Sequence, residues 1–148
     1  MIRGIAAVGP NGVLGWNNEL IYRNKQDLAR FKNLTLGRNI LMGRKTWESI
    51  GSKPLPGRKN WVLSKSLSGP NVLHNCFEAF NVLGDDFDVI GGESLFSQLR
   101  SEITHLELTV FSEWAEGDTY FPMDMLQYFS VTKQEHCTTH SFYSLKAN

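Results

Sequence analysis

The sequence predicts an α/β fold: a single domain over residues 1–148, with a central, mostly parallel eight-stranded sheet, an antiparallel C-terminal strand and about four flanking helices. Strand and helix patterns alternate as far as residue 100, whereas strand patterns alone follow. Such alternation is typical of parallel sheets, whose right-handed crossovers place helices on both faces. A chain of 148 residues, of which 41% are hydrophobic, is long enough to bury one core.

The first part of the chain contains a strand, a long loop and a helix. Residues 2–8 read as a buried strand, and the strong turn signal Gly9-Pro10-Asn11-Gly12 follows. No period is visible from Gly9 to about Asn24, and a loop of this length in a small domain is usually functional or mobile. Residues 25–35 carry apolar side chains at helical spacing and end before the helix-stopping Gly37.

Shorter strands and helices follow. Asn39-Ile40-Leu41-Met42 is a short apolar strand that leads through Gly43 into a helix. Residues 105–112 alternate apolar and polar side chains, as a half-buried strand does. The other predicted elements are a helix at about 45–50, strands at 60–64 and 71–74, a helix at 77–83, a strand at 88–90, a helix around 95–99, and strands at 128–135 and 140–146.

Charge is distributed unevenly along a chain whose net charge is zero. Twelve of the fifteen Lys and Arg residues lie within residues 1–74, and twelve of the fifteen Asp and Glu residues lie within 75–148. Either the two halves dock through opposite charges, or the basic first half lines a site for a polyanionic ligand. The basic side chains form no nucleic-acid-binding motif, so we expect no nucleic-acid partner.

Neither a membrane segment nor a secretory leader is expected. No apolar run approaches the roughly 18 residues of a spanning helix, and MIRGIAAVGPNG lacks the apolar core of a signal peptide. Cys76 and Cys137 make no disulfide framework, which favours free thiols and a cytoplasmic location. The spacing in Glu135-His136-Cys137-Thr138-Thr139-His140 fits no common zinc pattern, so no metal site is expected.

Two turns from strand to helix are candidate ligand sites. They are Met42-Gly43-Arg44-Lys45-Thr46 and Ile90-Gly91-Gly92-Glu93-Ser94, at the carboxyl ends of predicted parallel strands, where α/β sheets bind ligands. Free N–H groups at a helix start suit phosphate, and glycine permits close approach of the backbone. Each turn alone is better explained as an ordinary tight turn from strand to helix. Together, with basic residues on one of them, the two turns are as consistent with binding a phosphate-bearing ligand as with a purely structural role. Neither matches a dinucleotide or P-loop motif.

Two charged residues have both a structural and a functional interpretation. Asp27 lies beside Leu28 and one turn before Phe31, so its carboxylate shares the apolar face of the predicted helix. Its negative charge either interacts favourably with the helix dipole in the first turn, or it binds and protonates a cationic heterocycle. Arg58, after the rigid turn Pro54-Leu55-Pro56-Gly57, is either a solvated charge or a fork for a ligand carboxylate.

Several blocks of the sequence resemble bacterial-type dihydrofolate reductases. The most specific are Met42-Gly43-Arg44 with Thr46-Trp47-Glu48-Ser49-Ile50-Gly51, and Pro54-Leu55-Pro56-Gly57-Arg58-Lys59-Asn60. Others are Ile5-Ala6-Ala7, Asp27-Leu28-Ala29, Ile90-Gly91-Gly92, Thr109 and Glu116-Gly117-Asp118-Thr119. The resemblance covers nearly the whole chain. It implies reduction of 7,8-dihydrofolate to tetrahydrofolate by NADPH, with hydride transfer to pterin C6 and protonation at N5.

The resemblance also implies roles for individual residues. Asp27, bonded to Thr109, would hold the pterin and raise the proton affinity of N5, and Tyr22 would be the third catalytic residue. The substrate would contact Ile5, Ala6, Leu28, Phe31, Lys32, Ile50, Leu55, Arg58 and Ile90, with Arg58 taking the glutamyl α-carboxylate. NADPH would contact Ala7, Leu14, Gly15, Asn18, Gly43, Arg44, Lys45, Thr46, Leu63, Ser64, Lys65, Ile90, Gly92, Glu93, Ser94, Leu95 and Phe96. Its 2′-phosphate would be read by Arg44, Ser64 and Lys65.

By the same resemblance, the early loop is an active-site lid that Asp118 clamps by accepting backbone N–H bonds. The Gly91-Gly92 peptide would be cis. The chain departs from the family at Tyr22, where Trp is usual, at Phe96, where Tyr is common, and at Ser94, where Arg is frequent.

The expected ligands include diaminopyrimidine and pteridine antifolates, and the expected state is a monomer. Two alternatives stay open. One is a reductase of the same fold acting on another pyrimidine-like substrate, which the combination of Asp27 with Arg58 disfavours. The other is a pterin- or nucleotide-binding protein without turnover.

Overall fold

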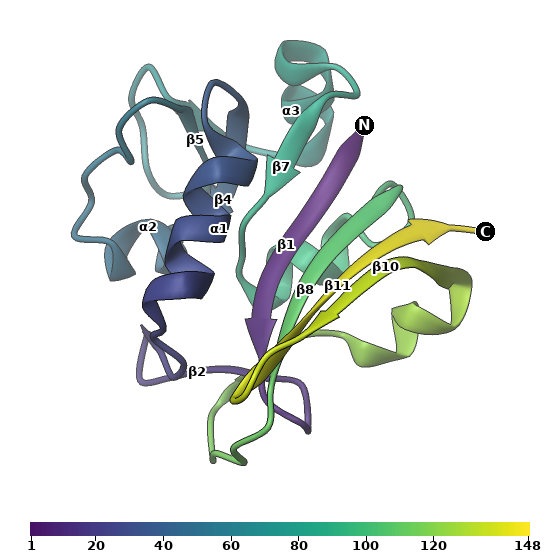
Figure 1. Cartoon of the computed structure of the whole chain (residues 1–148). Helices are drawn as coiled ribbons and strands as arrows, with labels where there is room; N and C mark the ends of the chain where they lie inside the picture. The colour runs from purple at the N-terminus through teal and green to yellow at the C-terminus, as the bar shows by residue number, and fades with distance from the viewer.

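An eight-stranded sheet forms the centre of the computed structural model, which describes residues 1–148 (Figure 1). Its strand order is β10-β11-β8-β1-β7-β4-β5-β6. The six strands from β8 to β6 pair in parallel, whereas β11 is antiparallel to both β8 and β10. This arrangement confirms the predicted fold class. The strands are β1 (Ile2–Val8), β4 (Asn39–Gly43), β5 (Lys59–Leu63), β6 (Val72–Leu73), β7 (Phe87–Val89), β8 (His105–Phe111), β10 (Phe129–His136) and β11 (His140–Ala147).

Four α-helices accompany the sheet, close to their predicted positions: α1 (Lys25–Thr35), α2 (Arg44–Ser49), α3 (Cys76–Leu83) and α4 (Glu93–Gln98). α1 begins where the Asn24 side chain accepts a hydrogen bond from the Asp27 N–H, which satisfies one of the free donors of the first turn. A 3₁₀ helix, η1 (Met123–Tyr128), was not predicted.

A second, three-stranded sheet forms partly within the segment expected to be an irregular loop. It consists of β2 (Val13–Trp16), β3 (Glu19–Leu20) and β9 (Thr119–Tyr120), in the order β3-β2-β9. Asn17 and Asn18 have φ values of 51° and 63°, and they form the two-residue turn of the β2–β3 hairpin. The prediction of a loop throughout residues 9–24 is therefore wrong, because these strands are too short to show a period.

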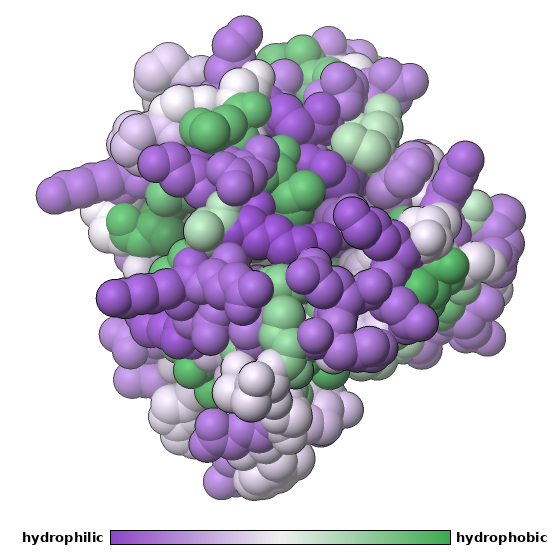
Figure 2. All heavy atoms as spheres, viewed as in Figure 1, coloured by the Kyte–Doolittle hydropathy of each residue, from purple (hydrophilic) through white to green (hydrophobic).

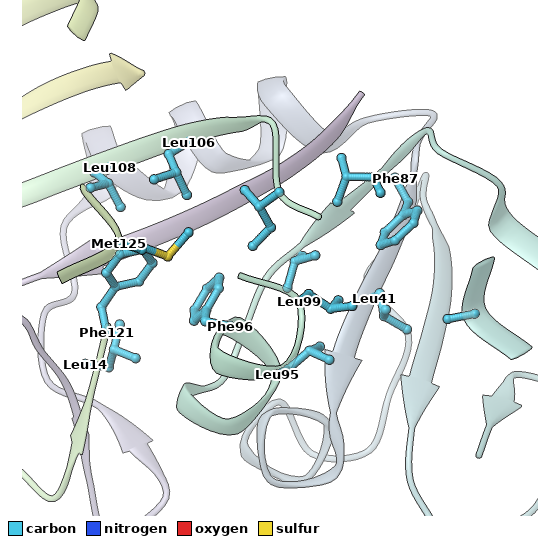
Figure 3. Close-up of a cluster of buried hydrophobic side chains, with 14 of the residues drawn as sticks. Leu14, Leu41, Phe87, Leu95, Phe96, Leu99, Leu106, Leu108, Phe121 and Met125 are labelled. Carbon is cyan, nitrogen blue, oxygen red and sulfur yellow. The ribbon is translucent and has the colours of Figure 1, made fainter. Parts of the chain in front are cut away.

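Hydrophobic side chains pack on both faces of the large sheet. On one face, Leu95 and Phe96 of α4 pack with Leu106 of β8 and with Leu41 of β4 (Figure 3). Side chains alternate along a strand, so the neighbours of Leu41 point to the opposite face. There Ile40 and Met42 form a smaller cluster with Val62, against which Trp47, Ile50, Leu55, Leu67 and Ile90 pack.

Opposite charges dock the two halves of the chain at Asp88. Its carboxylate is fully buried and accepts hydrogen bonds from Arg3 Nε and Nη2, at 3.0 and 2.9 Å, and from Arg38 Nε at 2.9 Å. Desolvation works against the charge of Arg38, but its hydrogen bonds to Asp88 and Asp86 outweigh that cost and raise its pKa. The docking interpretation of the charge asymmetry therefore holds for these two arginines.

The face of the molecule that carries α1 is mainly hydrophilic. Figure 2 shows hydrophobic atoms on this face only as separate patches between hydrophilic side chains. None of the helices has the length and apolar character needed to cross a membrane.

Candidate active site

A cleft of about 1560 Å³ lies at the carboxyl ends of the parallel strands. Strands β1, β7, β4 and β5 are neighbours and run in the same direction, so the segments that follow them share one edge of the sheet. Every residue that the resemblance assigns to the site, from Ile5 to Thr109, lines this cleft. The fold therefore brings all of them together, while their individual roles stay predictions.

Asp27 faces the cleft from the first turn of α1, half-buried. Its Oδ1 accepts a hydrogen bond from Thr109 Oγ1 of β8 at 2.5 Å. No protein hydrogen bond reaches Oδ2, although a carboxylate can accept several. Asp27 is thus both a first-turn residue, as the structural interpretation has it, and a carboxylate with one oxygen open to a ligand.

Apolar side chains surround this carboxylate. Ile5 of β1 is 7% exposed, and Phe31, Ile50 and Leu55 are half-buried, whereas Leu28 is 52% exposed within the cleft. An exposed leucine at the mouth of a cleft gains stability when a flat ring covers it. These residues make a slot that suits an aromatic ligand.

Arg58 lies near the far end of α1 from Asp27. Its Nε donates to the Pro56 carbonyl at 2.9 Å, and its Nη1 donates at 3.2 Å to the hydroxyl of Thr35. Its guanidinium carbon lies 5.9 Å from the centre of the Phe31 ring. Burial lowers the pKa of this guanidinium, which nevertheless stays charged at neutral pH. The remaining donors can bind a carboxylate as a fork.

The two glycine-led turns meet at the centre of the cleft. The Gly43 N–H donates to the Gly91 carbonyl at 2.8 Å, and the Gly91-Gly92 peptide is cis, as the resemblance implies. A Cβ atom at Gly91 or Gly92 would lie 3.3 or 3.4 Å from Thr46 Oγ1, so side chains there would crowd the turn. Gly43 and Gly92 begin α2 and α4, and no side chain caps either helix. Their first-turn N–H groups fit a pyrophosphate.

Basic residues flank these turns. Arg44 Nη1 donates to both carboxylate oxygens of Glu48, at 2.9 and 3.0 Å. An exposed pair at this spacing contributes about 0.3–0.5 kcal/mol, so a phosphate can replace Glu48 at little cost. Lys65 is exposed, whereas the hydroxyl of Ser64 accepts hydrogen bonds from two N–H groups of the turn that follows it.

The β2–β3 hairpin forms a further wall of the cleft. Asp118 Oδ2 accepts a hydrogen bond from the Asn17 N–H at 3.0 Å, and the Asp118 N–H donates to the Gly15 carbonyl at 2.9 Å. A Cβ atom on Gly117 would lie 2.5 Å from that carbonyl oxygen, so this approach requires glycine. Asp118 thus accepts a backbone N–H bond from the early segment, as the resemblance implies, while its role as a clamp on a lid stays a prediction.

Tyr22 bridges the segment before α1 and the loop after β8. Its ring stacks on Phe111 with centroids 4.7 Å apart, and its hydroxyl donates to the Glu113 carbonyl at 2.6 Å. Desolvation, together with the negative charge of Glu113, raises the pKa of this hydroxyl, so it stays a donor. The hydroxyl is therefore engaged with a loop, and its catalytic role stays a prediction.

Some residues of the cleft differ from the sequence-based expectation. Leu95 and Phe96 are 2% and 1% exposed, so they support the cleft mainly from the core (Figure 3). Sequence analysis did not identify Arg30, nor a group of cleft residues around the start of α3: His74, Asn75, Cys76 and Gln98. A third strand-to-helix turn, after residue 74, could have revealed that group, but it lacks the glycines that mark the other two.

Comparison with known proteins identifies relatives over most of the chain. A sequence model described as dihydrofolate reductase matches residues 1–146. A dihydrofolate reductase of Staphylococcus aureus is 38% identical over 114 residues, which cover 74% of this chain and 70% of that protein. The bifunctional dihydrofolate reductase-thymidylate synthase of Paramecium tetraurelia is 32% identical over 137 residues, which cover 87% of this chain and 30% of that protein.

A solved structure is similar over the whole chain. It is the dihydrofolate reductase from Enterococcus faecalis complexed with NADP(H) and RAB-propyl. The two structures superpose with a TM-score of 0.91 at 26% sequence identity, covering 100% of this chain and 96% of that one.

Proposed function

This chain belongs to the dihydrofolate reductase family, and from that premise we propose how its residues carry out the reaction. The enzyme is an oxidoreductase that reduces 7,8-dihydrofolate to 5,6,7,8-tetrahydrofolate with NADPH. Tetrahydrofolate then serves one-carbon metabolism. The observation that carries the assignment of roles is the half-buried Asp27 carboxylate, bonded to Thr109, in the same cleft as Arg58 and the two glycine-led turns.

The pterin ring binds at Asp27. Its N3–H and 2-amino group are neighbouring donors, which match a carboxylate with free acceptor capacity. Thr109 fixes Oδ1 at 2.5 Å and thereby orients the carboxylate plane. Ile5 and Phe31 enclose the ring, and they exclude water from the reacting edge.

The glutamate tail binds at Arg58. Thr35, which accepts the Arg58 bond, lies eight residues after Asp27 on α1, a distance of about 12 Å at 1.5 Å per residue. That spacing suits a ligand whose pterin and carboxylate ends are separated by a benzoyl ring. Lys32, exposed on the same helix, adds positive charge near this end.

NADPH, when bound, supplies a hydride from its nicotinamide ring to pterin C6. The N–H groups that begin α2 and α4 hold its pyrophosphate, and Thr46 adds a hydroxyl. Arg44 and Lys65 bind the 2′-phosphate, with Ser64 alongside them, and so favour NADPH over NADH. Ala7, Leu14 and Gly15 surround the nicotinamide end, where the β2–β3 hairpin closes the cleft.

The proton for N5 arrives through water rather than directly from a side chain. The negative charge of Asp27 raises the proton affinity of N5 across the pterin ring. Closure of the hairpin, held by Asp118, keeps bulk water away during hydride transfer. Tyr22 stabilises the same closure through its bond to the Glu113 carbonyl.

Three finer points extend this proposal. Diaminopyrimidine and pteridine antifolates bind at Asp27, because they present the same pair of neighbouring donors as the pterin. The enzyme works as a monomer, since a single chain supplies every residue of the cleft. It acts in the cytoplasm, where its two free cysteines and a reduced dinucleotide cofactor are compatible with the redox state.

The decisive experiment follows NADPH oxidation after dihydrofolate is added to the purified protein. We expect oxidation that depends on dihydrofolate and that a diaminopyrimidine antifolate abolishes. Oxidation with another pyrimidine-like substrate but not with dihydrofolate would support the alternative reductase. Tight binding of both ligands without oxidation would support a binding protein and contradict the proposed function.

A further inference from the structure

Two contacts, one helical turn apart, join α1 to β8. Asp27 and Arg30 lie three residues apart on one face of α1, and Glu107 and Thr109 lie two residues apart on one face of β8. Thr109 Oγ1 donates to Asp27, and Arg30 Nη2 donates to Glu107 Oε2 at 2.5 Å. The first contact belongs to the substrate site, whereas the reaction as described above does not use the second.

The Arg30–Glu107 pair is largely buried and is supported by β11. The two side chains are 25% and 14% exposed. Ser144 Oγ donates to Glu107 Oε2 at 2.8 Å, and the Arg30 guanidinium carbon lies 4.6 Å from the centre of the Phe142 ring. Strand pairing places Ser144 opposite Glu107 and Phe142 opposite Thr109. The same strand therefore backs both contacts between α1 and β8.

Few other charges lie near Asp27. β1 places uncharged Ile5 and Ala7 opposite Glu107 and Thr109, and β11 contributes only Phe142 and Ser144 at this level. From the segment before α1, Tyr22 is a neutral donor to a backbone carbonyl, and Arg23 is exposed. The remaining charges on α1, Lys25 and Lys32, are also exposed and screened by solvent. Arg30 and Glu107 are thus the partly buried charges closest along their elements to the Asp27–Thr109 bond. His105, on the same face of β8, also interacts with Glu107, but it lies four positions from Thr109, and burial lowers its pKa.

We propose that Arg30 and Glu107 are a positioning pair, which holds α1 against β8 with no net charge and so sets both the place of Asp27 and the pH range of dihydrofolate reduction. This inference rests on the proposed function. With both partners present, their effects on a proton in the active site oppose each other. Loss of one partner leaves the other as an uncompensated, largely buried charge about one turn from Asp27.

The test compares Arg30→Met, Glu107→Gln and the double variant. Hydride transfer is measured in single turnovers across a range of pH, and the rate falls as pH rises because N5 must gain a proton. Arg30→Met leaves the negative Glu107, which favours the protonated state, so the midpoint moves to higher pH by about 0.5–1 unit. Glu107→Gln leaves the positive Arg30, so the midpoint moves to lower pH by a similar amount. The double variant returns towards the wild-type midpoint.

Two controls separate this effect from a loss of packing. Arg30→Lys retains the charge, so the midpoint stays near that of the wild type even where the melting temperature falls. Arg100→Met removes an arginine from another ion pair, the exposed Arg100–Asp124 contact at 2.6 Å, and leaves the midpoint unchanged. If Arg30→Met does not fold, the direction in which Glu107→Gln moves the pH midpoint tests the proposal on its own. Glutamine keeps the shape of the side chain and can still accept the Ser144 bond, so this variant is expected to fold.

Opposite shifts that cancel in the double variant support the proposal. Shifts in the same direction, or a lower melting temperature with an unchanged midpoint, overturn it. The pair would then only stabilise the contact between α1 and β8. Failure of the proposed function is a separate outcome, because the wild-type protein would then show no dihydrofolate-dependent oxidation of NADPH at all.

Discussion

Arg58 illustrates how single residues in the cleft are oriented by their neighbours. Bonds to Pro56 and to the buried Thr35 fix its guanidinium, and Phe31 lies beneath it. Less side-chain entropy is lost when a ligand binds to a group that is already held in this way. This arrangement supports the proposed role of Arg58 in binding the glutamyl carboxylate.

Arg58→Leu is expected to raise KM for dihydrofolate about 10- to 100-fold, the equivalent of a charge-assisted bond worth roughly 1.5–3 kcal/mol. The KM for a pterin without the glutamate stays the same, since that substrate never reaches Arg58. Steady-state kinetics with both substrates measure the difference. Lys53→Met, at an exposed lysine of the preceding turn, serves as the control. A similar rise in KM for both substrates would contradict the assignment.

The sequence identified the candidate residues through motifs but could not reveal how they pair. Asp27 stands out because it shares the apolar face of a helix, and Arg58 because it follows the rigid turn Pro54-Leu55-Pro56-Gly57. No feature of the sequence distinguishes Arg30, because a single arginine on a helix is common and its partner Glu107 lies 77 positions away. The buried state of Phe96 likewise depends on contacts with Phe121, which local sequence cannot specify.

Among the elements, the β2–β3 hairpin links the cofactor end of the cleft to the rest of the fold. It is held by pairing with β9 and by the two backbone contacts of Asp118. β2 buries Val13 and Leu14, whereas β3 and the turn between the two strands are exposed, and a two-stranded hairpin is marginal on its own. We therefore expect the Asp118 carboxylate, which binds the turn residue Asn17, to influence how long the hairpin stays closed.

Asp118→Asn is expected to weaken the bond to the Asn17 N–H by about 1 kcal/mol, because a neutral oxygen replaces a carboxylate. The closed hairpin becomes less populated, so NADPH binds several-fold more weakly and hydride transfer slows by a similar factor. Stopped-flow fluorescence and single-turnover rates check both effects. The matched control is Asp124→Asn, at an exposed acid on the 3₁₀ helix. An unchanged affinity and rate would show that Asp118 does not control the hairpin.

The hairpin also shows why elements of two to four residues escape sequence analysis. The strands of the second sheet span at most two periods of alternation, which is too few to distinguish a strand from an irregular segment. The Asn17-Asn18 turn was an available signal, because asparagine tolerates positive φ and such pairs favour two-residue hairpins. The longer α1 and β8 were predicted within one residue of their observed ends, since their patterns span several turns or alternations.

At the scale of the whole molecule, Asp88 ties together distant parts of the chain. Its carboxylate binds Arg3 of β1 and Arg38 before β4, and Arg3 also donates to the Leu34 carbonyl of α1 at 2.8 Å. The central strands and the helix that carries Asp27 thus share one buried network. Such a network fixes relative positions more than it adds net stability.

Asp88→Ala is expected to lower the free energy of unfolding by about 3–5 kcal/mol, because two arginines lose their buried partner. Chemical denaturation measures the loss, with Asp85→Asn at an exposed neighbouring acid as the control. A loss below about 1 kcal/mol would mean that water replaces the carboxylate at this site.

The order of the strands is the part of the fold that the sequence could not supply. Alternating patterns predicted the parallel sheet, the antiparallel end and helices on both faces. They could not place β1 between β8 and β7, because pairing between strands about 100 residues apart is decided by packing and by contacts such as Arg3–Asp88. The uneven charge distribution indicated that the two halves of the chain dock through opposite charges, but it did not identify the pairs of Asp88 with Arg3 and Arg38.

The central claim is that the Asp27 carboxylate, in this cleft, enables protonation of the pterin during hydride transfer. Asp27→Asn tests it most directly, since asparagine can still accept the Thr109 bond and preserves the shape of the site. The measurement is the single-turnover rate of dihydrofolate reduction against pH. We expect a loss of about 10²- to 10⁴-fold at neutral pH, with the remaining rate rising as the solution supplies more protons and with NADPH affinity unchanged. A rate at neutral pH close to that of the wild type would contradict the account.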